Sequence, residues 1–200
     1  MSMSSLVITQ LKNIPLIKKG DNLSDLLSES LLSEGISLEN GDILGVTSKI
    51  ISKAEDRIVK LSNVKPSSKA MKLAEKINRD PRLVELILGE STEIIRATER
   101  ALIVEHRLGF ICANAGIDHS NVGGEEGLLL RLPLDPDASA RTIRQRLAGL
   151  TGANGPVLVI DSHGRPWRFG TVGVVIGLSG LAPVQDLRGT PDLFGHPLRY

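Results

Sequence analysis

Apolar residues are spaced along the chain either at helical intervals or in short continuous runs. The helical intervals predict helix in three regions: one after Asp21 or Asn22, one over 66–89 in two pieces broken before Pro81, and one after Asp135. Asp and Asn are favoured helix caps, and the proline after Asp135 suits a first helical position. The apolar stripe of the first helix consists of Leu23, Leu26, Leu27 and Leu31. Glycines are expected to end the first and third helices, at Gly35, Gly149 and Gly152.

Short runs rich in Val, Ile and Leu predict strands. These runs are 6–8, 42–47, 54–59, 101–104, 108–112, 128–132, 157–160 and 173–178. The runs 101–104 and 108–112 are close enough to form a hairpin across His106 and Arg107. Strands and helices are interspersed without the regular spacing of βαβ units, which favours a mixed α+β fold over a doubly wound sheet. Because no repeat or low-complexity block interrupts the pattern, we expect one domain over residues 1–200.

Composition narrows the function classes. A formal net charge of +1 and an aromatic content of 2 % give no basis for binding nucleic acid through a basic surface or stacked bases. The chain has no apolar run long enough to span a membrane and no secretory signal at its start, so a cytoplasmic protein without a membrane partner is expected. The single cysteine, Cys112, lies in an apolar run and is expected to be a buried, unreactive thiol.

Two polar clusters follow apolar runs. The run 108–112 leads through small residues to Asp118, His119, Ser120 and Asn121. The run 157–160 leads directly into Asp161, Ser162 and His163. Carboxylates at the ends of two strands predict a shared site for Mg²⁺ or Mn²⁺, which prefer oxygen ligands. The alternative is that each aspartate only caps the turn after its strand.

Ser48, Lys49 and Lys53 follow the predicted strand 42–47. An ammonium group binds phosphate as a point charge, although lysines at a strand end are also commonly just solvated. If this segment is extended, neighbouring residues point to opposite sides of it. The chain has no Gly-x-x-x-x-Gly-Lys-Ser/Thr, so a nucleotide site here is not a P-loop.

The histidines leave a second chemistry open. His119 and His163 each lie close in sequence to an aspartate, a pattern that also suits a Zn²⁺ or Mn²⁺ phosphoesterase. A surface or supporting role is the other interpretation. The basic loop after Asp161, with Arg165, Trp167 and Arg168, either binds an anionic substrate or is a structural turn.

Three segments resemble the coenzyme F420:L-glutamate ligase family, also called F420-0:gamma-glutamyl ligase. They are Val-Thr-Ser-Lys-Ile-Ile-Ser-Lys-Ala-Glu at 46–55, Cys-Ala-Asn-Ala-Gly-Ile-Asp-His-Ser-Asn-Val at 112–122 and Asp-Ser-His-Gly-Arg-Pro-Trp-Arg at 161–168. The resemblance covers nearly the whole chain and implies a mixed α+β fold with largely antiparallel sheets and flanking helices. It also implies a homodimer.

The resemblance assigns roles to residues. It implies that GTP is contacted by Ile14, Pro15, Leu16, Ile17, Ser48, Lys53 and Asn121. It implies that a divalent metal is bound by Asp118, Asp161 and the hydroxyl of Ser162, and it makes K⁺ a further candidate cofactor. Asp118, Asp161 and Lys53 are the residues expected to act in catalysis. Positions 119 and 163 vary in the family pattern, which weakens the phosphoesterase alternative.

The implied reaction joins L-glutamate to the F420 precursor. GTP would activate a carboxylate of the precursor as an acyl phosphate, and the amine of L-glutamate would displace phosphate to form a γ-linked amide. The rivals are a related ligase with another acceptor, and a nucleotide- or metal-binding protein without turnover. Family members usually continue past the segment 197–200, so we expect the 200-residue form to be less stable than a longer relative and to bind GTP more weakly.

Overall fold

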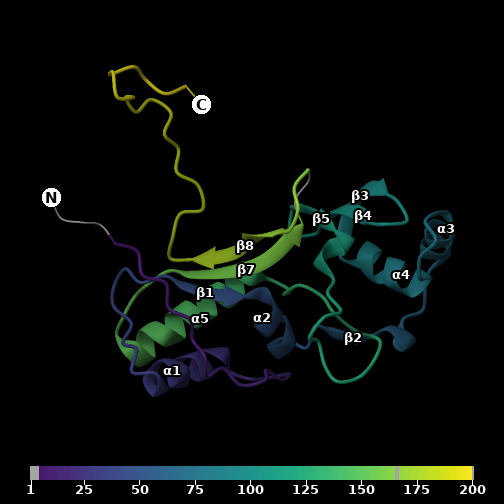
Figure 1. The fold of residues 1–200 in the computed structure, drawn as a ribbon, viewed down its shortest axis with the longest axis horizontal. Helices are drawn as coiled ribbons and strands as arrows, with labels where there is room; N and C mark the ends of the chain where they lie inside the picture. Colours follow the sequence, from purple (N-terminus) through teal and green to yellow (C-terminus); the bar gives the residue numbers. More distant parts are fainter. Residues whose placement is uncertain (1–4, 165–166, 200) are drawn as a thin grey trace.

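The computed structural model of the chain describes residues 5–164 and 167–199. Within these ranges the polypeptide forms an elongated α+β molecule with three small sheets (Figure 1). The helices are α1 (Leu23–Ser33), α2 (Ser48–Ala54), α3 (Ser68–Lys76), α4 (Pro81–Gly89) and α5 (Pro136–Thr151), with 3-10 turns at Leu61–Asn63 and Asn114–Gly116. The strands are β1 (Leu44–Thr47), β2 (Ile58–Lys60), β3 (Ser91–Ala97), β4 (Leu102–His106), β5 (Ile111–Ala113), β6 (Leu128–Leu130), β7 (Val157–Gly164) and β8 (Thr171–Ser179). The predicted mixed α+β class is confirmed.

Antiparallel pairing predominates, as the resemblance implies. The first sheet has the order β1-β7-β8, in which β1 and β7 are parallel and β7 and β8 are antiparallel. The other two sheets, β2-β6 and β3-β4-β5, are antiparallel throughout. The predicted hairpin across His106 and Arg107 is confirmed as β4 and β5.

The helix boundaries follow the capping residues. The side chain of Asn22 accepts a hydrogen bond from the Asp25 amide at the start of α1, and Asp135 does the same for the Ala138 amide of α5. Gly152 adopts a left-handed φ of 77° and ends α5 as predicted. The prediction that Gly149 also helps to close this helix was wrong, because α5 continues to Thr151.

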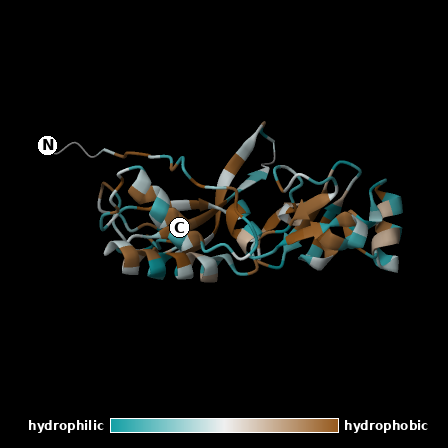
Figure 2. Ribbon diagram, turned by 90° about the horizontal axis from the view of Figure 1, so that it is seen from below, coloured by the Kyte–Doolittle hydropathy of each residue, from teal (hydrophilic) through white to brown (hydrophobic). Residues whose placement is uncertain are grey.

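Two hydrophobic cores lie at opposite ends of the molecule (Figure 2). The first core packs α1 and α5 against one face of β1 and β7, and it consists of Ile17, Leu23, Leu27, Val46, Ile51, Ala140, Ile143, Leu147, Val157 and Val159. The second core packs α3 and α4 against β4 and the turn after β5, and it consists of Ala70, Ala74, Ile77, Val84, Ile87, Leu102, Val104 and Ala115. The segments between the cores contain the polar clusters recognised in the sequence.

The strand predictions failed at four places. Residues 6–8 form no strand, and each of them is at least 80 % exposed because no strand of the described ranges covers them. Residues 48–54 are helical, so the assumption of an extended segment at the lysines fails. The strand predicted to end at Ile160 continues to Gly164 because β8 pairs with it along its whole length. Strand β3 was missed, since Ser-Thr-Glu-Ile-Ile-Arg-Ala lacks a continuous apolar run.

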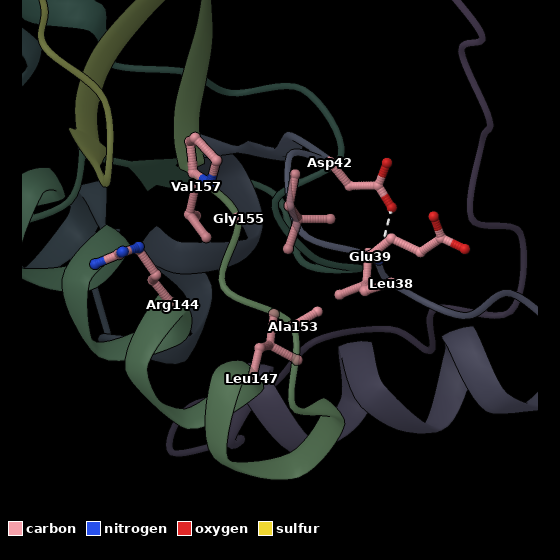
Figure 3. A pocket seen from close by; sticks show the side chains of 10 residues that line it. Leu38, Glu39, Asp42, Arg144, Leu147, Ala153, Gly155 and Val157 are labelled. Atoms are coloured by element: carbon pink, nitrogen blue, oxygen red, sulfur yellow. Dashed lines mark hydrogen bonds between the residues drawn. The ribbon is translucent and has the colours of Figure 1, made fainter.

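One small cavity is structural. It lies between the start of β7, the preceding loop and α5, and its walls include Leu147, Ala153 and Val157 (Figure 3). Its volume of about 20 Å³ holds no more than a water molecule. Gly155 is required here, because a Cβ atom would lie 2.1 Å from the Asp42 carbonyl oxygen. In the described part of the chain, no helix is long and apolar enough to cross a membrane.

Candidate functional site

A cavity of about 440 Å³ lies between the elements of the first hydrophobic core and those of the second. Three segments that are distant in sequence form its walls: the junction of β1 and α2, the loop after β5, and the outer half of β7. The lining residues are Thr47, Ser48, Lys49, Cys112, Ala113, Gly116, Ile117, Asp118, His119, Ser120, Asp161, Ser162, His163 and Gly164. The structure therefore brings both predicted aspartates to one cavity.

A tight turn aims Asp118 into this cavity. Asn114, Ala115 and Gly116 all have positive φ angles, of 52°, 52° and 64°. Such angles are unusual for alanine, and Ala115 is held there by complete burial in the second core. After the turn, the backbone of Asp118 exchanges two hydrogen bonds with Leu130 of β6, at 2.9 and 2.8 Å. The carboxylate thus projects from a fixed backbone.

Asp118 is fully engaged by polar groups. Its Oδ2 lies 2.6 Å from the Lys49 ammonium. Its Oδ1 accepts hydrogen bonds from the amide and the hydroxyl of Ser120, both at 2.8 Å. Partial burial alone would raise the pKa of Asp118, but Lys49 and Ser120 outweigh it and lower the pKa to about 2. The carboxylate is therefore ionised throughout the physiological range.

Asp161 lies within β7, where it is paired with Val174 of β8, and not at the end of a strand as predicted. The hydroxyl of Ser48 donates a hydrogen bond to its Oδ1, and His163 Nε2 lies 3.1 Å from its Oδ2. Burial favours a raised pKa for Asp161, yet His163 and Ser48 stabilise the charged form more strongly and the pKa falls below its ordinary value. Both carboxylates are thus negatively charged at neutral pH.

Ser162 also borders the cavity, but from the other face of β7. Successive side chains of a strand alternate between faces, and here Asp161 and His163 are partly buried whereas Ser162 is exposed. The hydroxyl of Ser162 and the carboxylate of Asp161 therefore leave the strand in opposite directions. A single ion bound between the two aspartates would therefore lie on the face of β7 away from the Ser162 hydroxyl.

The residues expected to contact GTP are divided by the structure. Ser48 is buried beside Asp161, and Lys53 Nζ donates to the Asn121 carbonyl oxygen at 2.7 Å. Ser48, Lys53 and Asn121 therefore lie along α2 and the loop that faces it. Ile17 belongs to the first core and Ile14 packs against that core, whereas Pro15 and Leu16 are exposed. The segment 14–17 does not line the cavity described above.

Sequence reasoning gave too little weight to two residues of the site, Lys49 and His163. Lys49 and Lys53 are four residues apart on a helix and lie on the same face, and the expectation of an extended segment was wrong. Lys49, not Lys53, contacts a carboxylate of the cavity. His163 touches Asp161 and packs on Phe110, with ring centroids 5.2 Å apart. The helical spacing of the lysines was the available signal for the first of these contacts.

Comparison with known proteins identifies the family. The family model described as F420-0:Gamma-glutamyl ligase matches residues 12–200. The chain belongs to this family. A protein of Methanothermobacter thermautotrophicus called coenzyme F420:L-glutamate ligase is 46 % identical over 94 % of this chain and 73 % of its own length. Proteins of the same name from Methanopyrus kandleri and Archaeoglobus fulgidus are 42 % and 43 % identical, over 98 % and 94 % of this chain and 77 % and 72 % of their own lengths.

The donor set of this family member fits a hard divalent cation. Asp118 and Asp161 supply carboxylates, and serine hydroxyls surround them. No group of three or more His, Cys, Asp or Glu side chains in the described ranges is placed to hold an ion by itself. An ion here would be held by two carboxylates and complete its shell with water and substrate oxygens, as Mg²⁺ commonly does. This arrangement does not favour an Asp/His zinc site.

Cys112 has no reactive character in this ligase-family site, as the sequence predicted. It is buried, and burial together with the nearby Asp161 charge raises the pKa of its thiol to about 11. A protonated thiol is a poor nucleophile at neutral pH. Covalent catalysis by Cys112 is therefore disfavoured.

The two histidines of the cavity are expected to differ. His163→Ala should weaken Mn²⁺ binding by about tenfold, because supporting partners that orient a ligand typically contribute 10- to 100-fold to metal affinity. His119→Ala is the matched control, since His119 is exposed and its loss should change the affinity less than about twofold. Titration with Mn²⁺ monitored by electron paramagnetic resonance measures both. If both variants lose binding completely, the histidines are ligands and the phosphoesterase alternative returns.

Proposed function

We propose that this protein joins L-glutamate in γ-linkage to the coenzyme F420 precursor, using GTP and a divalent cation. The observation that carries the proposal is the convergence of two ionised aspartates and Lys49 in one cavity, in a chain of the F420-0:gamma-glutamyl ligase family. The relatives' common name supplies the substrates. Lysines and carboxylates around an open cavity suit the handling of phosphates, which need positioning and charge neutralisation more than covalent chemistry.

The bonds exchanged define what the residues must do. A carboxylate oxygen of the precursor attacks the γ-phosphorus of GTP, GDP leaves, and an acyl phosphate forms. The amine of L-glutamate then attacks the acyl carbon, phosphate leaves, and the amine loses a proton as the amide forms. A divalent cation, when bound, would neutralise charge on the phosphate oxygens. Asp118 and Asp161 would hold it, whereas the hydroxyl of Ser162, expected as a further ligand, leaves β7 on the face opposite to Asp161.

The nucleotide is proposed to lie along α2, from Ser48 at its start to Lys53 in its last turn. Ser48, Lys53 and Asn121 are adjacent there, and Lys53 already points its ammonium toward the loop that contains Asn121. A point charge at this position would stabilise negative charge on the phosphates. The segment 14–17 would contribute through its backbone and the exposed Pro15 and Leu16, because the side chains of Ile14 and Ile17 pack into the first core.

The function is tested by following product formation. The purified chain is incubated with GTP, Mn²⁺, L-glutamate and the deazaflavin precursor, with KCl present or absent to examine K⁺. We expect GDP release that requires both the precursor and glutamate, and a deazaflavin product heavier by one or more glutamyl residues in mass spectrometry. GDP release that requires glutamate and a carboxylic acid other than the deazaflavin precursor would identify another acceptor. Binding of GTP without any release would contradict the proposal and leave a binding protein.

We also propose that the active form is a homodimer in the cytoplasm. Light scattering coupled to size-exclusion chromatography measures the mass in solution, for which the chain mass of 21.5 kDa is the reference. A mass of about twice that value supports the dimer, and a monomer that turns over at full rate contradicts it.

A further inference from the structure

Lys49 contacts the oxygen of Asp118 that does not accept hydrogen bonds from Ser120. Its ammonium group lies 2.6 Å from Asp118 Oδ2 and donates to the Ser120 carbonyl oxygen at 2.8 Å and to the Ser120 hydroxyl at 3.3 Å. The other carboxylate oxygen, Oδ1, already accepts two hydrogen bonds from Ser120. An incoming cation therefore meets Asp118 at Oδ2, where it encounters a positive charge.

The contact of Lys49 with Asp118 and Ser120 is held by the tertiary structure. Lys49 projects from α2 and reaches a loop more than sixty positions away in the chain, at Asp118 and Ser120. Its side chain is 27 % exposed, so it lies against the cavity wall and is not free in solvent. In contrast, Lys53 on the same helix face contacts a neutral carbonyl group. Only one of the two lysines compensates a carboxylate of the cavity.

We propose that Lys49 is a built-in counter-ion of Asp118, which neutralises the carboxylate in the metal-free protein and must leave it before a divalent cation binds. The inference rests on the proposed use of a divalent cation at this cavity. A monovalent ammonium and a divalent cation repel each other at contact distance, so the two compete for the same carboxylate. Lys49 therefore lowers the affinity of the site for the ion while preventing an uncompensated charge at Asp118 in its absence.

The test is Mn²⁺ binding to the full chain without nucleotide or substrates. Lys49→Met keeps the length of the side chain and removes its charge. We expect it to tighten Mn²⁺ binding by about fivefold or more, the lower end of usual coupling between two sites. Lys49→Arg keeps the charge and should bind Mn²⁺ as the wild type does. Lys60→Met is the matched control. Lys60 forms an ion pair with Glu125, with 2.8 Å between Nζ and Oε2, and neither residue lines the cavity.

A second readout uses thermal unfolding. Without Mn²⁺, Lys49→Met should unfold at a lower temperature than the wild type, and saturating Mn²⁺ should raise its midpoint by more than it raises that of the wild type. Unchanged or weaker Mn²⁺ binding by Lys49→Met overturns the proposal, as does the absence of Mn²⁺ binding from all forms. GDP release by the wild type is measured separately, so failure of the counter-ion proposal and failure of the ligase proposal are distinguished.

Discussion

Asp161→Asn and Asp118→Asn are each expected to lower GTP turnover at limiting Mn²⁺ by about 10²-fold or more, the size of effect seen when one preorganised electrostatic group is removed. Each substitution keeps the shape of the side chain and removes one of the two negative charges in the cavity. An aspartate that only capped a turn would tolerate asparagine well, since both residues are good caps. The two interpretations of these aspartates therefore predict opposite results.

The measurement is the rate of GDP release over a range of Mn²⁺ concentrations. Asp56→Asn is the matched control, because Asp56 forms an exposed ion pair with Lys19 and its left-handed φ of 57° is equally accessible to asparagine. The control should keep nearly full turnover, and all three variants should remain folded at the assay temperature. Near-normal turnover by either cavity variant at limiting Mn²⁺ would refute a shared cation site.

Glu90→Gln is expected to destabilise the protein by about 3–5 kcal/mol, the usual result of removing one partner from a buried ion-pair network. The side chain of Glu90 is only 6 % exposed. Three arginines converge on it: Arg57 at 2.7 Å, Arg107 at 2.9 Å and Arg131 at 3.2 Å. Without the carboxylate, their positive charges would repel one another with no anion between them. A loss of this size is a large part of the 5–15 kcal/mol that stabilises a typical domain.

This network joins α4 and the turn between β4 and β5 to the segments around β2 and β6. Glu90 follows α4, Arg57 precedes β2, Arg107 is in the turn between β4 and β5, and Arg131 follows β6. Arg57 and Arg107 also donate to the carbonyl groups of Leu132, Pro133 and Leu134. Loss of Glu90 should therefore loosen the packing between these segments as well as lower the stability.

Urea unfolding at several pH values tests the role of Glu90. Burial favours a raised pKa for Glu90, but Arg107 and Arg57 outweigh it, so its folded-state pKa lies below the ordinary value. The advantage of the wild type over Glu90→Gln should thus be complete above the pKa of an unfolded glutamate and disappear as the pH falls through the folded-state pKa. Glu93→Gln, at an exposed position of β3, is the control. A difference below about 1 kcal/mol at neutral pH would contradict the network's role.

The sequence determined much of the local structure. Asn22, Asp135 and Gly152 mark helix ends because capping depends on side chains within a few residues of the cap. The hairpin of β4 and β5 was predicted for the same reason, since its partners are separated by a short turn. The motifs around Asp118 and Asp161 also identified the family, because each depends on residues that are close together in the chain.

Only the tertiary structure decided the length of β7 and the shape of the site. Asp161 follows an apolar run, so the sequence suggests a strand end there, but pairing with β8 extends the strand past it. Because side chains alternate along a strand, this extension places the side chains of Ser162 and Asp161 on opposite faces of β7. The contact of Lys49 with Asp118 likewise joins α2 to a loop that no local pattern connects with it. Long-range pairing and packing determine these features, and they depend on partners that a local reading of the chain does not contain.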